Sequence, residues 1–68
     1  MKLSARNVLK GKIVDVKKGK VTAHVRIQVA SGAVITSSIT NEAVAELKLK
    51  KGDTAWAVIK ASDVMIGK

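Results

Sequence analysis

The chain has 68 residues, of which 47% are hydrophobic and one is aromatic, and its formal net charge is +8. We expect residues 1–68 to form a single domain. A domain of this size buries only about 60% of its unfolded surface, so it needs another source of stability. Cysteine is absent and histidine occurs once, which excludes a disulfide framework and a zinc site. Association between copies remains, and the positive charge predicts an anionic partner.

No hydrophobic run is long enough to cross a membrane, so we expect no membrane partner. Residues 1–6 (MKLSAR) also lack the apolar core of a secretory signal peptide. We therefore expect a cytoplasmic protein.

The first half of the chain is typical of antiparallel strands. Residues 9–18 predict a first strand, in which Gly11 marks a bulge or bend. Residues 20–30 alternate between apolar and polar side chains, the pattern of a strand with one buried face. Residues 33–40 predict a third strand, and Ser31-Gly32 before it suits a hairpin turn.

The second half begins with a helical pattern. Residues 40–50 predict a short helix with Thr40 as its N-cap and Glu42 in its first turn. Residues 54–60 predict a fourth strand, and residues 61–66 predict a fifth strand or a continuation of the fourth. The expected fold is therefore all-β with a small α element: a five-stranded OB-like β-barrel with one short helix between strands 3 and 4.

The fourth strand is apolar on both faces, because Ala55 and Ala57 alternate with Trp56 and Val58. In so small a barrel one face of this strand should be in contact with water. An apolar outer face therefore predicts a subunit interface. The alternative is that Trp56 lies flat on the surface of a single copy.

The sequence offers no set of side chains for catalysis. His24 falls on the polar face of its strand and is expected to be a surface or interface residue. The acidic residues show no paired spacing that would suit general acid–base chemistry. We therefore predict that the chain is not an enzyme and carries no cofactor.

Hydrogen-bond donors gather at three points, which are residues 4–7 (SARN), Thr40 at the expected helix start, and residues 60–62 (KAS). A tetrahedral dianion only accepts hydrogen bonds, so it needs hydroxyl groups, N–H groups and fixed positive charges without a competing carboxylate. The three points supply that set if the fold brings them together. If they stay apart, each is an ordinary solvated surface or helix cap.

Three stretches resemble the molbindin, or Mop, domain family: SARNVLKGKIVDVKKGKV (4–21), ITSSITNEAVAELKLKKGD (35–53) and VIKASDVMI (58–66). The resemblance implies an OB-like barrel that binds molybdate and tungstate for storage and homeostasis of molybdenum. It also implies homohexamers, described as trimers of dimers, with the oxyanions bound at subunit interfaces. The metal would be held as its oxyanion and not as a bare cation.

The resemblance also implies which residues bind the oxyanion. By position these are Ser4, Ala5, Arg6, Thr40, Lys60, Ala61 and Ser62. Some relatives have a serine at the position of Ala43, where this chain would offer only a backbone N–H. A second class of site lies around a three-fold axis of such assemblies, and the turn Lys18, Gly19 and Lys20 is a candidate for it. The alternative for this turn is a hairpin with solvated lysines.

One rival interpretation is a small basic OB-like nucleic-acid-binding module. Such barrels bind single strands through a charged groove and stacked aromatic side chains. Trp56 alone cannot stack several bases, so we expect no nucleic-acid partner. A weaker rival is a scaffold domain whose anion sites have lost their function.

Overall fold

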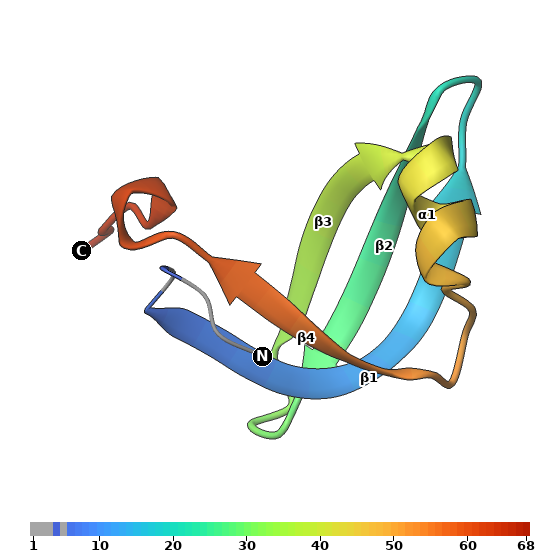
Figure 1. Ribbon diagram of the computed structural model, residues 1–68. Coiled ribbons are helices and arrows are strands. Elements are labelled where there is room, and N and C mark those ends of the chain that lie inside the picture. Colours follow the sequence, from blue (N-terminus) through green and yellow to red (C-terminus); the bar gives the residue numbers. More distant parts are fainter. Residues whose placement is uncertain (1–3, 5) are drawn as a thin grey trace.

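The computed structural model describes Ser4 and residues 6–68. Strands, one α-helix and one 3-10 turn follow one another along this part of the chain (Figure 1). They are β1 (Asn7–Lys18), β2 (Thr22–Val29), β3 (Val34–Thr40), α1 (Asn41–Leu47), β4 (Thr54–Ile59) and η1 (Ala61–Asp63). The helix therefore lies between the third and fourth strands.

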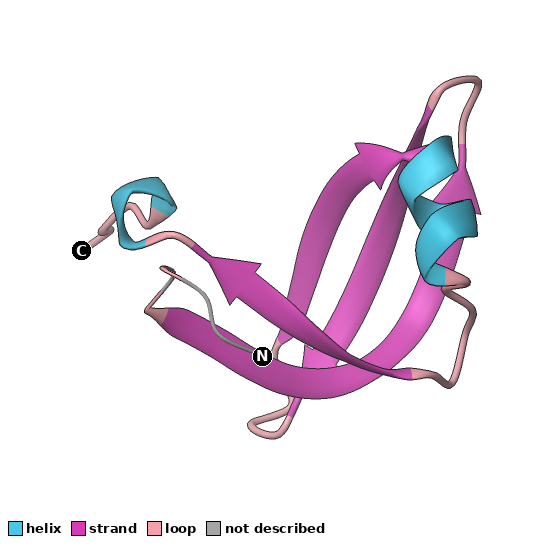
Figure 2. Cartoon of the chain, viewed as in Figure 1, coloured by secondary structure: helices cyan, strands magenta, loops and turns pink. Residues whose placement is uncertain are grey.

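The strands form one antiparallel sheet in the order β3-β2-β1-β4 (Figure 2). β1 is the longest strand, and it pairs with β4 near its beginning and with β2 from its middle to its end. The sheet curls into a half-barrel with α1 at one end. β3 and β4 are the edge strands, and in the described residues the half-barrel stays open between them.

The hydrophobic core lies on the inner face of the curled sheet. The alternation in residues 20–30 predicted this, because the side chains of β2 that point inward are the buried ones. The helix packs against β2 and β3 and contributes one buried residue. The buried core consists of Ile13, Ala23, Val25, Ile27, Val44 and Ala57.

The bulge in β1 lies beyond the glycine that was expected to cause it. The β1–β2 register shifts between Ile13 and Asp15, so the extra residue is Val14. A bulge of this kind bends a strand and increases its twist, which helps to close the sheet toward a barrel. The expectation of a bulge at Gly11 was therefore wrong.

Gly11 has a different role, which is close approach between strands. It is paired with Val29 of β2 and with Ala55 of β4. A Cβ atom at this position would collide with the carbonyl oxygen of Gln28 and lie 2.8 Å from Cγ2 of Ile27. Only a residue without a side chain fits there.

The fifth strand expected at residues 61–66 is not formed. β4 ends at Ile59, which is paired with Asn7, the first residue of β1. Because β1 begins at Asn7, it does not extend alongside the residues beyond Ile59, and these have no strand beside them in the described part of the chain. Ala61–Asp63 forms the 3-10 turn η1 instead, and Val64, Met65 and Ile66 are exposed. The sheet therefore has four strands.

The helix is shorter than the range 40–50 predicted for it. It begins after Thr40, whose Oγ1 accepts a hydrogen bond from the Ala43 N–H at 3.0 Å, so the predicted N-cap is confirmed. It ends at Leu47, and the C-cap residue Lys48 adopts the left-handed conformation with φ of 53°. Because the chain turns away there, Leu47 is 66% exposed.

Candidate functional site

Two of the three donor clusters lie at the same end of the sheet. We call residues 4–7 the opening cluster and residues 60–62 the closing cluster. Asn7 is the register partner of Ile59, and its Nδ2 donates a hydrogen bond to the Ile59 carbonyl at 3.3 Å. Arg6 directly precedes Asn7, Lys60 directly follows Ile59, and both residues are exposed. The β1–β4 ladder therefore joins two clusters that are more than fifty residues apart in the sequence.

A short turn shapes the closing cluster. Lys60 precedes η1, and its carbonyl accepts the Asp63 N–H at 2.9 Å. Ser62 lies within this turn and is exposed. The turn also contains Asp63, so a carboxylate stands beside the donors that were expected to be free of acidic groups.

Ser4 is exposed near the start of β1, as Arg6 is. Ala5 lies outside the described residues. Ala61 is the first residue of η1, and its carbonyl accepts the Val64 N–H at 3.2 Å. The described residues of these two clusters thus provide two cations and two hydroxyl groups at one end of the β1–β4 ladder.

Thr40 lies at the other end of the molecule. It is the last residue of β3, and its partner in the β2–β3 register is Thr22, the first residue of β2. Its hydroxyl oxygen accepts the Ala43 N–H, so this hydroxyl and this N–H already engage each other. The hydroxyl hydrogen of Thr40 remains available to donate, because accepting a bond through the oxygen does not consume it.

β1 separates the two groups of donors. This strand of twelve residues pairs with Ile59 at its start and leads into the turn before Thr22 at its end, in a molecule whose longest extent is 33 Å. The start of α1 and the turn η1 lie at opposite ends of the molecule (Figure 1). Hydrogen bonds reach only about 3 Å. The two groups of donors therefore lie apart within one copy of the chain, and each is a candidate half-site that a single anion could not share with the other in that copy.

The Lys18-Gly19-Lys20 turn lies at the Thr40 end. The Asn41 side chain donates a hydrogen bond from Nδ2 to the Gly19 carbonyl at 2.9 Å. The sequence interpretation treated this turn and Thr40 as separate sites and did not single out Asn41. The sequence places Asn41 directly after the N-cap residue. That position alone does not show which turn the Asn41 side chain contacts.

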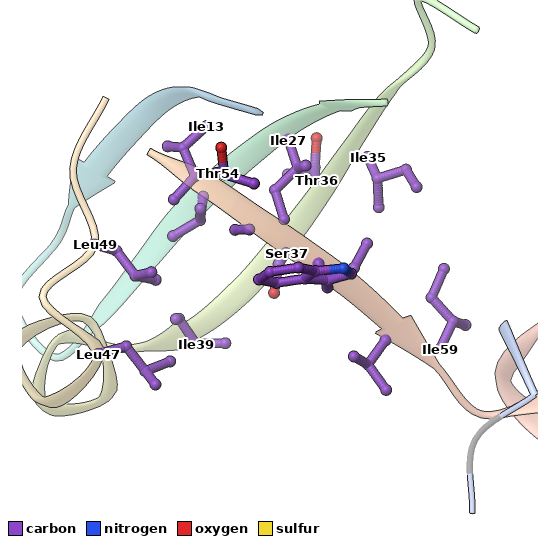
Figure 3. Close-up of a pocket in the computed structure, with 15 residues that line it drawn as sticks. Ile13, Ile27, Ile35, Thr36, Ser37, Ile39, Leu47, Leu49, Thr54 and Ile59 are labelled. Atoms are coloured by element: carbon purple, nitrogen blue, oxygen red, sulfur yellow. The ribbon is translucent and has the colours of Figure 1, made fainter. Parts of the chain in front are cut away.

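An apolar groove of about 660 Å³ lies between the open edges of the sheet. Its lining includes Ile35, Thr36 and Ile39 of β3 and Thr54 and Ile59 of β4, and Figure 3 shows Leu47 and Leu49 together at one end, beside the helix. Trp56, which is 49% exposed, belongs to its lining, and the Lys10 Nζ lies 5.9 Å from the centre of the Trp56 ring. The lining is mostly apolar and contains none of Ser4, Arg6, Thr40, Lys60 and Ser62, so the groove suits a protein segment better than an oxyanion.

Among the residues that the structure describes, no three His, Cys, Asp or Glu side chains gather into a cluster that could hold a metal ion. The one α-helix found there is too short to reach across a lipid bilayer.

Comparison with known proteins relates the chain to one family. Residues 3–66 match the model of the TOBE domain. The chain is 49% identical over 67 residues to a probable molybdenum-pterin-binding protein of Haemophilus influenzae, and the match covers 98% of this chain and 97% of the relative. Nearly full coverage on both sides means that the two chains correspond along their whole length.

Solved structures agree with the sequence match. MopII from Clostridium pasteurianum superimposes with a TM-score of 0.93 at 51% identity, covering 98% of this chain and all of that chain. ModG, described as a cytoplasmic molybdate-binding protein and solved with molybdate bound, gives a TM-score of 0.92 at 51% identity. In that case the match covers 96% of this chain and 46% of ModG.

A match to the TOBE model along almost the whole chain, together with the resemblance of the SARN and KAS motifs to Mop domains, identifies the family. The chain belongs to the TOBE-domain family of molybdenum-pterin-binding and molybdate-binding proteins.

Proposed function

We propose that this protein binds molybdate or tungstate reversibly, at interfaces between copies of the chain, for storage and homeostasis of molybdenum in the cytoplasm. The observation that carries the proposal is the division of the donor residues into two half-sites at opposite ends of one chain. The relatives named above are molybdenum- and molybdate-binding proteins, and ModG is described as cytoplasmic. We propose no catalytic step, because capture needs only hydrogen bonds and charge.

The first half-site supplies most of the charge. Arg6 and Lys60 compensate the two negative charges of the oxyanion, and Ser4 and Ser62 donate their hydroxyl hydrogens to its oxygens. The segments that include Ala5 and Ala61 contribute backbone N–H groups. This assignment is supported by the Asn7–Ile59 pairing, which holds the two segments side by side.

The second half-site comes from another copy of the chain. Thr40 supplies a hydroxyl donor there, and the Ala43 N–H reinforces it indirectly by fixing the Thr40 oxygen. An anion that binds only the associated form stabilises that form by mass action. The open sheet edges, the apolar groove and the exposed residues Val64, Met65 and Ile66 all favour association, and a homohexamer built as a trimer of dimers is the expected assembly.

Selection among oxyanions would depend on size and protonation. Molybdate and tungstate are larger than sulfate, so a cavity of their size holds sulfate loosely. Phosphate is partly protonated at neutral pH, and a pocket made of donors offers no acceptor for its proton. Asp63 is the carboxylate nearest along the chain to the first half-site, and it must point away from the anion for this selection to work.

Isothermal titration calorimetry tests the proposal. We expect molybdate and tungstate to bind the protein with measurable heat and sulfate to give little. Arg6→Ala and Lys60→Ala should each lose most of the molybdate signal, because a buried dianion is left with an uncompensated charge. Lys51→Ala, which removes an exposed lysine from a distant turn, is the matched control and should bind like the parent.

Two results would contradict the proposal. If Arg6→Ala and Lys60→Ala both bind molybdate like the parent, the site assignment is wrong. If the parent ignores molybdate but binds single-stranded DNA with a steep dependence on salt, a nucleic-acid-binding function would replace it.

A further inference from the structure

The turn between β1 and β2 is held against the start of α1 by a single residue. The Asn41 Nδ2 donates to the Gly19 carbonyl at 2.9 Å, and the Asn41 backbone N–H donates to the Val21 carbonyl at 2.7 Å. The turn is closed by its own bond from the Gly19 N–H to the Thr22 carbonyl at 2.7 Å. Asn41 therefore forms two hydrogen bonds with the turn, one from its side chain and one from its backbone.

This connection places two lysines near a proposed oxyanion-binding residue. Lys18 and Lys20 flank Gly19, and both are exposed. Thr22, which ends the turn, is the register partner of Thr40. The lysine-bearing turn and Thr40 are about twenty residues apart in the sequence, yet the fold makes them one continuous structural unit.

The environment of Asn41 indicates that its amide serves more than packing. Its Oδ1 is buried and has no hydrogen-bond donor among the described residues. A buried carbonyl oxygen without a donor lowers stability. An apolar residue would avoid that cost, but it would also lose the bond from Nδ2 to Gly19 that fixes the turn.

We propose that Asn41 is a positioning residue for oxyanion capture. Its amide fixes the turn of Lys18, Gly19 and Lys20 beside Thr40, so that the lysine charge is held at the second half-site. This inference rests on the proposed function of oxyanion binding. It joins the turn, which sequence reasoning considered as a separate site, to the site that contains Thr40.

A double-mutant cycle in molybdate affinity tests the inference. Calorimetric titrations with sodium molybdate compare the parent, Asn41→Ala, Lys20→Gln and the double variant. We expect Asn41→Ala to weaken the affinity about fivefold to tenfold, the effect of losing one hydrogen bond that orients a charged group. Lys20→Gln should weaken binding severalfold in the parent and hardly at all in the Asn41→Ala background, because the lysine is then no longer held in place.

Gln28→Ala is the matched control. The Gln28 Nε2 also donates to a turn carbonyl, that of Gly32 at 3.4 Å, but in the hairpin between β2 and β3. Its molybdate affinity should equal that of the parent. If Asn41→Ala fails to fold, Gly19→Ala disturbs the same turn independently, since the added Cβ would lie 2.9 Å from the Thr22 carbonyl oxygen. It should reproduce both the weaker affinity and the loss of the Lys20 effect.

The outcomes separate this inference from the function on which it rests. A parent protein that does not bind molybdate overturns the proposed function, and the inference with it. A parent that binds, with variants at Asn41 or Gly19 of unchanged affinity, overturns the inference alone. Strictly additive effects of Asn41→Ala and Lys20→Gln also overturn it, because Asn41 would then act on stability and not on the placement of the lysine.

Discussion

At Gly11 the β1 backbone passes so close to β2 that an added methyl group would lie 2.8 Å from Cγ2 of Ile27. We expect Gly11→Ala to lower the free energy of unfolding by about 1–3 kcal/mol, because the strands must move apart to admit the new atom. Urea denaturation measures this change. Gly67→Ala, where nothing lies within 4 Å of the new Cβ, is the control and should change stability by less than about 0.5 kcal/mol. Equal stability of the two variants would contradict the argument.

At the level of single residues, the donor requirements of a dianion selected three points in the sequence as a predicted site: residues 4–7, Thr40 and residues 60–62. They could not show that Arg6 and Lys60 share one end of the sheet, because this depends on the register between β1 and β4. Nor could they reveal Asn41, whose role depends on a turn that approaches it in space.

At the scale of elements, α1 depends on its N-cap residue, Thr40. Thr40→Ala removes the N-cap acceptor of the Ala43 N–H, and such losses cost about 1 kcal/mol of stability. Thr40→Ser keeps a hydroxyl group and should retain both the stability and the molybdate affinity. Circular dichroism during urea denaturation and calorimetry with molybdate measure the two properties separately. If Thr40→Ala loses stability but binds molybdate unchanged, Thr40 is a helix cap and not part of the binding site.

The elements differ in how well the sequence predicts them. The alternation in residues 20–30 and the Ser31-Gly32 turn predicted β2 and its hairpin, because one buried face and a glycine with φ of 90° leave few alternatives. The expected fifth strand was wrong, although residues 61–66 include apolar side chains. A strand requires a neighbour with free backbone groups, and β1 begins only at Asn7, the partner of Ile59, so it does not extend alongside residues 61–66.

At the scale of the whole molecule, one copy is an open half-barrel with the two proposed half-sites at opposite ends. If association completes both the barrel and the site, the melting temperature should rise with protein concentration and rise again when molybdate is added. Native mass spectrometry at the same concentrations should show a species of six chains that carries bound molybdate. A melting temperature that is independent of concentration, with only single chains detected, would contradict the proposed assembly.

The open groove has a practical consequence for optical spectroscopy. The chain contains one tryptophan and neither tyrosine nor phenylalanine, so its near-ultraviolet emission comes from Trp56 alone. This indole is half-exposed in the groove lining, with the Lys10 ammonium near its ring. Removing water from the groove should shift the emission to shorter wavelengths. The unlabelled protein thus carries an intrinsic fluorophore at the surface where a second copy is expected to dock.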